Sequence, residues 1–320
     1  MKLSFRDALK ESLLSLGQEY PALVVVTPDL AKSLRIVDFK QTFPERYISV
    51  GVSEADMIGV AAGLATTGLI PVAAAFAMFA VEKPFEQIRN AIAYPNLNVK
   101  IVATHGGICV GPDGATHQAI EDLALMRALP NFTVLVAADA LETRAALKAA
   151  LEHKGPVYLR LGRDEAEVVY REEKEFIIGK ADLLRSGNDV TLVACGPMVA
   201  KALQAAEELE KVKVEARVIN MHCLKPLDEE VLLQAARETG CMVTVEDHTR
   251  IGGLGGAVAE LLVRKHPVPV EQVALDDQFG ESGDAEDLFQ KYGLTVSHII
   301  AAAEKAMLRK SSQIFMKERR

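Results

Sequence analysis

The stretch 47–81 places a carboxylate, Glu54, ahead of a long uncharged run that ends near two aromatic rings. The uncharged run covers residues 58–81, and the rings are Phe76 and Phe79. A carboxylate beside apolar surface holds its proton more tightly, because burial disfavours the charged form. Glu54 is therefore a candidate acid or base.

The uncharged run is long enough to be read as a membrane-spanning helix. It consists mostly of alanine and glycine, however, and residues 66–68 and Pro71 interrupt it. Insertion into a bilayer favours Leu, Ile, Phe and Val instead. We therefore expect a strand, a helix and a second strand.

Two structural roles could explain the same residues without any chemistry. Glu54 and Asp56 could be first-turn acids of a helix capped by Ser53, where carboxylates interact with free amides and the helix dipole. Phe76 and Phe79 could be ordinary core residues, since most aromatic side chains pack inside proteins. The residue types alone leave both alternatives open.

A second candidate site is the loop at 105–118, which follows an expected strand and contains His105, Asp113, His117 and several glycines. Ligands of open parallel sheets bind at the carboxyl ends of strands, and histidine can move protons near neutral pH. The spacing of the two histidines fits no common pattern of metal ligands. We therefore expect no metal site in this chain.

Four arginines could hold a phosphate group: Arg6, Arg35, Arg160 and Arg163. For any one of them alone, a solvated surface charge is the favoured interpretation. Arg163 comes directly after an expected strand, which places it at the end of the sheet where ligands bind. The sequence contains no Walker-type phosphate loop.

The elements that must position these side chains are short apolar segments that alternate with helical segments. This alternation predicts an α/β protein with mostly parallel sheets covered on both faces. We expect two doubly wound domains, at residues 1–165 and 183–320, joined by a charged linker at 166–182. One of the expected helices covers residues 82–94 and ends at Pro95.

Composition narrows the class of protein. The chain of 320 residues has a net charge of −8, which provides no basic surface for nucleic acid or anionic membranes. Its four cysteines are scattered and form no CxxC pair. Reduced thiols and a cytoplasmic location are expected from this pattern.

Longer motifs resemble one known family. The segments GVSEADMIGVAAGLATTGLIPVAAAFAMF, FEQIRNAIAYPNLNVKIVATHGGI, DGATHQ and PVYLRLGR resemble the transketolase family of thiamine diphosphate enzymes. The resemblance covers almost the whole chain and corresponds to the C-terminal half of a transketolase. It implies a pyrimidine-binding domain followed by a transketolase C-terminal domain.

The other half of such enzymes carries a GDG motif and a paired Asn, which hold Mg²⁺ and the diphosphate. The nearest string in this sequence is Pro112-Asp113-Gly114, with no Asn pair downstream. The resemblance therefore implies one subunit of a split transketolase, whose partner chain supplies the diphosphate and Mg²⁺ site. It also implies self-association across a two-fold axis, giving a heterotetramer.

The resemblance assigns cofactor and catalytic roles residue by residue. Glu54 falls at the glutamate that hydrogen-bonds to N1′ of the aminopyrimidine of thiamine diphosphate. Phe79, and more loosely Phe76, fall at the aromatic residues that pack on that ring. His105 and His117 fall at catalytic histidines on the substrate side.

The resemblance also assigns substrate-binding roles. Asp113 falls at the aspartate that reads a donor hydroxyl. Arg6, Ser33 and Arg163, together with His105, fall at positions that hold a sugar phosphate. Arginine suits this role because its planar fork binds phosphate through two hydrogen bonds.

Two departures from the family bear on the choice of sugars. Gly106 and Gly107 stand where many transketolases have Asp-Ser, and a further aromatic residue is replaced near Val81 and Glu82. The resemblance implies transfer of a two-carbon ketol unit from a ketose, phosphorylated by default, to an aldose. A 2-oxo acid dehydrogenase beta subunit, a 1-deoxyxylulose-5-phosphate synthase-like fragment and a non-catalytic scaffold subunit are the open alternatives.

Overall fold

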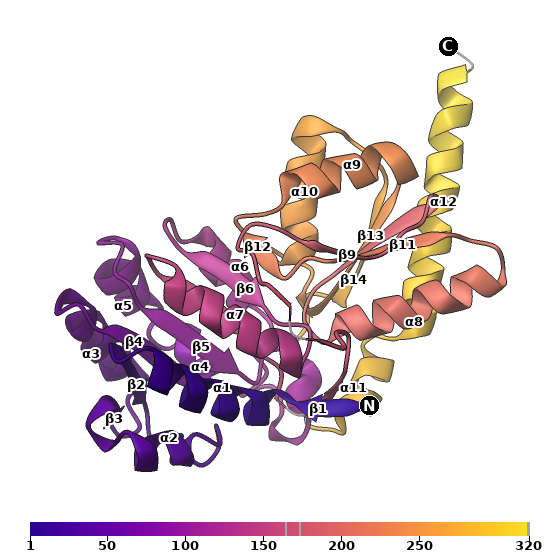
Figure 1. Cartoon of the computed structure of the whole chain (residues 1–320). Helices are drawn as coiled ribbons and strands as arrows, with labels where there is room; N and C mark the ends of the chain where they lie inside the picture. Colours follow the sequence, from indigo (N-terminus) through magenta and orange to yellow (C-terminus); the bar gives the residue numbers. More distant parts are fainter. Residues whose placement is uncertain (164, 173, 319–320) are drawn as a thin grey trace.

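Two mostly parallel sheets form the frame of the molecule, and helices cover both of them (Figure 1). The computed structural model describes residues 1–163, 165–172 and 174–318, with side chains up to residue 312. This architecture is the α/β fold with two wound domains that the alternating pattern predicts. Within the described residues, no helix combines the length and apolar character needed to cross a bilayer.

The first sheet has seven strands in the order β12-β6-β7-β5-β4-β2-β3. Their bounds are Cys223–Lys225 (β12), Thr133–Val136 (β6), Val157–Arg160 (β7), Lys100–Thr104 (β5), Ile70–Phe76 (β4), Leu23–Thr27 (β2) and Tyr47–Ser49 (β3). Neighbours are parallel except for β12, which runs antiparallel to β6. Strands β2, β5, β6 and β7 are buried at every position, as their continuous apolar sequences require.

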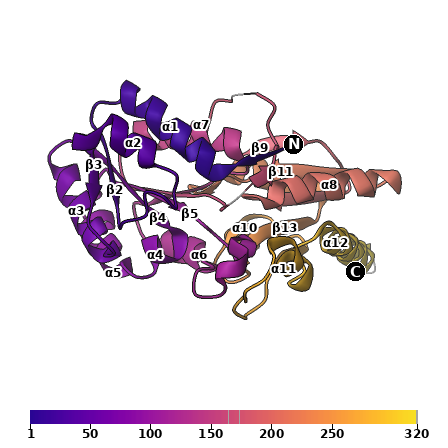
Figure 2. The same cartoon turned by 90° about the horizontal axis from the view of Figure 1, so that it is seen from below.

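Helices cover the two faces of this sheet unequally. Their bounds are Phe5–Glu19 (α1), Val37–Thr42 (α2), Pro44–Arg46 (η1), Glu54–Thr66 (α3), Ala77–Val81 (α4), Phe85–Gln87 (α5), Ile88–Ala93 (η2), Ile108–Asp113 (η3), Asp122–Ala128 (α6) and Ala140–Glu152 (α7). Helices α1 and α7 pack together on one face, whereas α3, α4 and α6 lie on the other (Figure 2). The single helix expected over 82–94 is wrong, because residues 82–84 form a turn and η2 is a π-helix.

The second sheet has five strands in the order β14-β13-β10-β11-β9. The strands are Val270–Leu275 (β14), Met242–Thr249 (β13), Val190–Ala194 (β10), Ala216–Asn220 (β11) and Asp182–Arg185 (β9), and the helices are Met198–Lys211 (α8), Glu229–Thr239 (α9), Leu254–Lys265 (α10), Ala285–Lys291 (α11) and Val296–Glu318 (α12). Helix α12 packs against α8, and α10 packs against α9. Only β9 runs antiparallel to its neighbour within this sheet.

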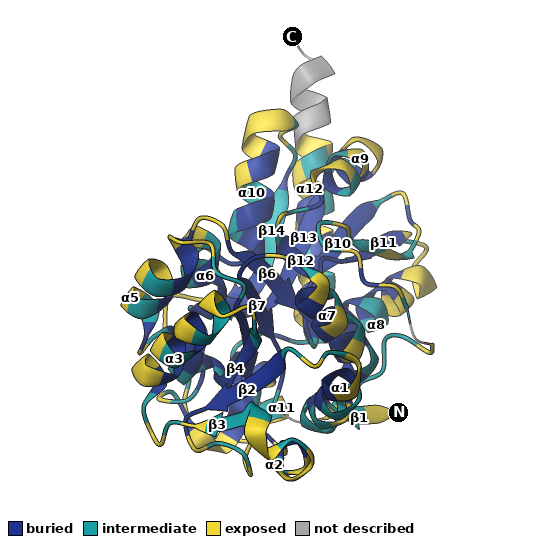
Figure 3. Ribbon diagram, turned by 60° about the vertical axis from the view of Figure 1, so that its left-hand side comes forward, coloured by how far each residue is buried: buried dark blue, intermediate teal, exposed yellow. Residues whose placement is uncertain are grey.

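The two sheets are not independent bodies. Strand β12 follows β11 in the chain but joins the first sheet, and β1 (Lys2–Ser4) pairs with β8 (Glu165–Glu167) beside the junction. One hydrophobic cluster contains Ile101 of the first sheet and Val193 of the second. Buried residues accordingly run through both sheets, while exposed ones gather on the outer faces of the helices (Figure 3). The segment predicted as a linker therefore contains part of β8.

Candidate active site

Glu54 is the first residue of helix α3, at the carboxyl end of β3. It is almost fully buried, whereas Asp56 in the same turn is exposed. Ser53 occupies the N-cap position, but its side chain makes no capping hydrogen bond. The helix-start alternative thus describes where Glu54 stands without explaining why its carboxylate is buried.

Glu54 is not the lone carboxylate that the uncharged run suggests. The ammonium of Lys83 lies 2.5 Å from its Oε2 atom, and the same ammonium lies 5.3 Å from the centroid of the Phe79 ring. Lys83 stands in the turn between α4 and α5. Sequence reasoning missed this contact, because the pattern at 82–94 predicts a regular helix that includes Lys83.

Phe76 and Phe79 each contact one histidine of the 105–118 loop. The Phe76 ring stacks on His105, with centroids 3.7 Å apart and planes at 28°. The Phe79 ring meets His117 edge to face, with centroids 5.0 Å apart. Both phenylalanines are only half-buried, and Phe76 also packs against a hydrophobic core cluster. Strand β4, helix α4 and the 105–118 loop thus bring four predicted site residues together.

His105 is held in an unusual backbone conformation. Its φ angle is +63°, and its Nδ1 atom lies 2.7 Å from the Thr104 hydroxyl. Burial, together with the charges of Arg6, Arg163 and His117, lowers the pKa of His105 to about 3. His105 is therefore neutral at neutral pH, when one ring nitrogen can donate a hydrogen bond and the other can accept one.

The two arginines predicted to bind phosphate both act on His105 electrostatically. Arg6 donates a hydrogen bond to the Ser33 carbonyl oxygen at 3.2 Å. Arg163 forms an ion pair with Asp113 at 3.4 Å and donates to the Val110 carbonyl oxygen. Guanidinium groups are thus concentrated beside His105, although Ser33 contributes its backbone rather than its hydroxyl to the contact.

The other two arginines considered for phosphate have structural partners. Arg160 is buried, lies 2.8 Å from Asp122 and also donates to the Asp247 carbonyl oxygen at 2.9 Å. Arg35 pairs with Asp7 on helix α1. Arg160 is therefore a core residue, and Arg35 belongs to a partly exposed ion pair.

The Gly106-Gly107 departure has a steric cause. Gly107 has a φ angle of +85°, and a Cβ atom there would lie 2.1 Å from the Asp247 carboxylate. At Gly106 a Cβ atom would lie 2.4 Å from Arg160 Nε. Asp247 accepts hydrogen bonds from the amides of Ile108 and Cys109 at 2.9 and 3.2 Å. The Arg160 guanidinium therefore fills the space that a side chain at Gly106 would need, and a carboxylate from the second sheet fills the space at Gly107.

Glu82 occupies the region where a family aromatic is replaced. Burial raises its pKa to about 8, and the neighbouring charges of Glu121 and Asp122 contribute to the rise. Glu82 is therefore largely protonated at neutral pH, next in sequence to Lys83. Sequence reasoning noted Glu82 only as a departure from the family and missed its raised pKa, since nothing local indicates that the two acids at the start of α6 act on it.

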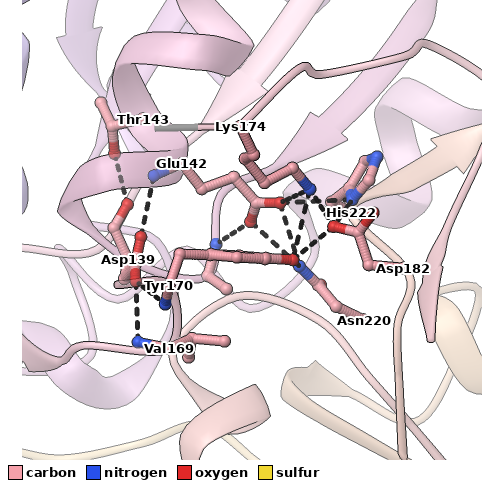
Figure 4. Close-up of polar contacts among 10 residues, drawn as sticks. Asp139, Glu142, Thr143, Val169, Tyr170, Lys174, Asp182, Asn220 and His222 are labelled. Atoms are coloured by element: carbon pink, nitrogen blue, oxygen red, sulfur yellow. Dashed lines mark hydrogen bonds and ion pairs between the residues drawn. The ribbon is translucent and has the colours of Figure 1, made fainter. Parts of the chain in front are cut away.

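A second cluster of chemistry-bearing side chains lies at the junction of the two sheets (Figure 4). Glu142, Asp182 and His222 place potential metal-ligand atoms within 4.8 Å of one another. The ammonium of Lys174 lies 3.2 Å from Glu142 and also contacts Asp182. Asn220 donates to both oxygens of Glu142, at 3.0 and 3.1 Å. The Lys174 ammonium thus offsets one of the two carboxylate charges in this cluster, which ties the two sheets together.

The sequence matches two family descriptions. Residues 1–169 match "Transketolase, pyrimidine binding domain", and residues 179–299 match "Transketolase, C-terminal domain". The chain is 46% identical over 292 residues to a "Putative transketolase C-terminal section" of Methanocaldococcus jannaschii, covering 90% of this chain and 92% of that protein. It is 44% identical over 306 residues to the 6-deoxy-6-sulfo-D-fructose transketolase subunit SqwH of a Clostridium species, covering 96% and 95%.

A solved structure described as "Split gene transketolase, inactive beta4 tetramer" superposes with a TM-score of 0.91 at 51% identity, covering 96% of this chain and 99% of that one. Both matched domains, their order and the length of these relatives correspond to the C-terminal section of a transketolase. The chain belongs to the transketolase family, as a C-terminal-half subunit of the split type.

Proposed function

We propose that this chain supplies the cofactor-pyrimidine half of a two-subunit transketolase that moves a two-carbon ketol unit from a ketose to an aldose. The observation that carries the proposal is that a buried carboxylate, Glu54, and the half-buried ring of Phe79 face one ammonium, that of Lys83, at the carboxyl edge of a parallel sheet. Subunits named as transketolases among the relatives support the reaction class.

The residues present fit thiamine diphosphate. When bound, this cofactor supplies the ring that takes up the two-carbon unit and passes it on. Glu54 would hold N1′ of the aminopyrimidine and exchange a proton there. Phe79 and Phe76 would pack on the same ring and keep water from it, which strengthens hydrogen bonds made inside the site.

On the substrate side, neutral His105 would donate to or accept from a sugar oxygen, and His117 would move a proton. Asp113 would accept a hydrogen bond from a donor hydroxyl. Arg6 and Arg163, with Ser33 beside Arg6, would hold a phosphate on the sugar. The positive field that these arginines impose on His105 supports an anionic substrate at this position.

The rest of the enzyme would come from a partner chain that carries the diphosphate-binding domain and the Mg²⁺ ligands. We propose that activity requires this partner and that the assembly is a heterotetramer about a two-fold axis. The relative described as an inactive beta4 tetramer supports the need for a second kind of subunit. The four free cysteines support a cytoplasmic location.

The test is affinity purification of this chain from its native cells, followed by native mass spectrometry of what accompanies it. A stoichiometric partner with the GDG motif is expected, and the complex should transfer ketol units between phosphorylated sugars. Decarboxylation of pyruvate by the same complex would favour the 2-oxo acid dehydrogenase or synthase alternatives. A chain that emerges alone and binds neither thiamine diphosphate nor Mg²⁺ would favour the scaffold alternative.

A further inference from the structure

We infer that Lys83 is a built-in lock on Glu54: its ammonium holds the carboxylate while no cofactor is bound, and thiamine diphosphate must displace it. The inference rests on the proposed function, because it takes Glu54 as the partner of the aminopyrimidine. It adds a self-inhibitory residue to the site, one that lies outside the motifs that carry the family resemblance.

Lys83 meets both surfaces that an aminopyrimidine would use. Its Nζ atom lies 2.5 Å from Glu54 Oε2 and 5.3 Å from the centroid of the Phe79 ring. A carboxylate and an aromatic ring each attract an ammonium group. A ligand that bonds to the same carboxylate and packs on the same ring cannot share that space with Lys83.

The lysine is the member of the pair that can move. Its side chain is 52% exposed, whereas that of Glu54 is 5% exposed. Lys83 stands in a turn before Pro84, and its flexible four-carbon stem can carry the ammonium into water. Glu54 is fixed by its place at the start of α3. Moving the Lys83 ammonium away from Glu54 therefore breaks one half-exposed ion pair and leaves the fold unchanged.

A second lysine–glutamate pair in the chain shows what a permanent contact looks like. The Lys174 side chain is 15% exposed, and its ammonium contacts both Glu142 and Asp182. Glu142 also accepts hydrogen bonds from the Asn220 amide and from a backbone amide. Of the side chains that the structure describes, Lys83 is the one that bonds to Glu54. Departure of Lys83 therefore frees Glu54 for a ligand.

The lock should have a measurable effect on affinity. For an ion pair with an exposed member, the equilibrium between the closed and the open form favours the closed form by about fivefold. A ligand that binds only the open form then has its apparent Kd raised by about the same factor. Replacing the ammonium by a neutral group should remove this penalty.

The experiment is a calorimetric titration of thiamine diphosphate, with Mg²⁺ in excess, into the complex of this chain with its co-purified partner. Lys83→Met keeps the apolar stem and removes the charge, and Lys83→Gln is a second neutral variant. Lys83→Arg keeps the charge and is the matched control. We expect the neutral variants to bind about fivefold more tightly than wild type and to load faster in stopped flow. Lys83→Arg should stay within about twofold of wild type.

Equal affinity of wild type and both neutral variants would overturn the lock. Weaker binding by the neutral variants would overturn it too, because Lys83 would then be a ligand of the cofactor. Glu54→Gln separates these results from the proposed function. If wild type binds the cofactor and turns over while Glu54→Gln does not turn over, the proposed function stands whatever Lys83→Met does.

Discussion

Glu54 and Glu142 are two buried carboxylates that the chain satisfies in opposite ways. Glu142 is bonded to Lys174, the Asn220 amide and the amide of Ala138, all held at the junction of two sheets. Among the side chains that the structure describes, Glu54 is paired with one half-exposed lysine at the edge of one sheet. A carboxylate with several fixed partners stabilises the fold, whereas one with a single removable partner is available to a ligand.

The largest expected effect is the loss of activity when Glu54 is changed. Glu54→Gln in the assembled complex should lower the rate of ketol transfer about a thousandfold, because an amide cannot exchange the proton at the pyrimidine. The free energy of unfolding should change little. Steady-state kinetics and urea unfolding of the same preparation check both expectations.

The matched control is Asp56→Asn, which alters an exposed acid in the same helical turn. It should leave turnover near the wild-type rate. Unchanged turnover in Glu54→Gln would contradict the account and favour a scaffold subunit.

Changing Glu142 should instead lower the stability of the fold. Glu142→Ala should lower the free energy of unfolding by about 3 kcal/mol, since it leaves the buried Ala138 amide without its acceptor and takes one partner each from Lys174 and Asn220. Urea unfolding measures this loss. Glu152→Ala, at the exposed end of the same helix, removes a bond to Tyr20 and should cost less than about 1 kcal/mol. Equal losses in the two variants would show that the junction cluster is not a special support.

The pH dependence of stability sharpens the contrast. The folded pKa of His105 is about 3, below its ordinary value of 6.5, so only the unfolded chain gains this proton as pH falls between those values. Stability should therefore fall on acidification by about 1.4 kcal/mol per pH unit in this window. Between pH 6.5 and 5, His105→Asn should lose about 2 kcal/mol less than wild type.

Glu142 acts in a lower window. Burial raises its pKa, but bonds from His222 and the charge of Lys174 outweigh burial, so the folded pKa lies below the ordinary 4.5. Its contribution is present above pH 4.5 and is lost as pH falls through the folded pKa. Urea unfolding at a series of pH values should show that His105 changes the free energy of unfolding at higher pH than Glu142 does. Parallel wild-type and His105→Asn profiles would contradict the neutral state of His105.

The smallest expected effect concerns the arginines near His105. Arg163→Met should raise KM for a phosphorylated sugar by about tenfold and leave kcat within a few-fold, because it removes charge-assisted binding without touching the proton-transfer groups. Arg35→Met, whose guanidinium pairs with Asp7, should leave KM unchanged. Initial-rate kinetics on phosphorylated and unphosphorylated sugars decide between phosphate binding and a structural role.

Continuous apolar runs predicted the buried parallel strands of both sheets, because a strand that is apolar at every position must be covered on both faces. Motifs predicted the residues that meet near His105, since each lies at a strand end or in the loop or helix that directly follows a strand. Lys83 escaped prediction because its position depends on where a helix breaks. The role of Asp247 was not predicted, because Asp247 and Gly107 belong to different domains of the chain and only the fold brings them together. Strand β12 escaped for a similar reason, since its sequence does not say which sheet it joins.

The central claim is that this chain holds half of a cofactor site that a partner completes. Its most direct test is to titrate thiamine diphosphate with Mg²⁺ into this chain, into the partner and into their equimolar mixture, by calorimetry. We expect tight binding of one cofactor per pair of chains in the mixture and little binding to either chain alone. Equally tight binding by this chain alone, or no binding by the mixture, would contradict it.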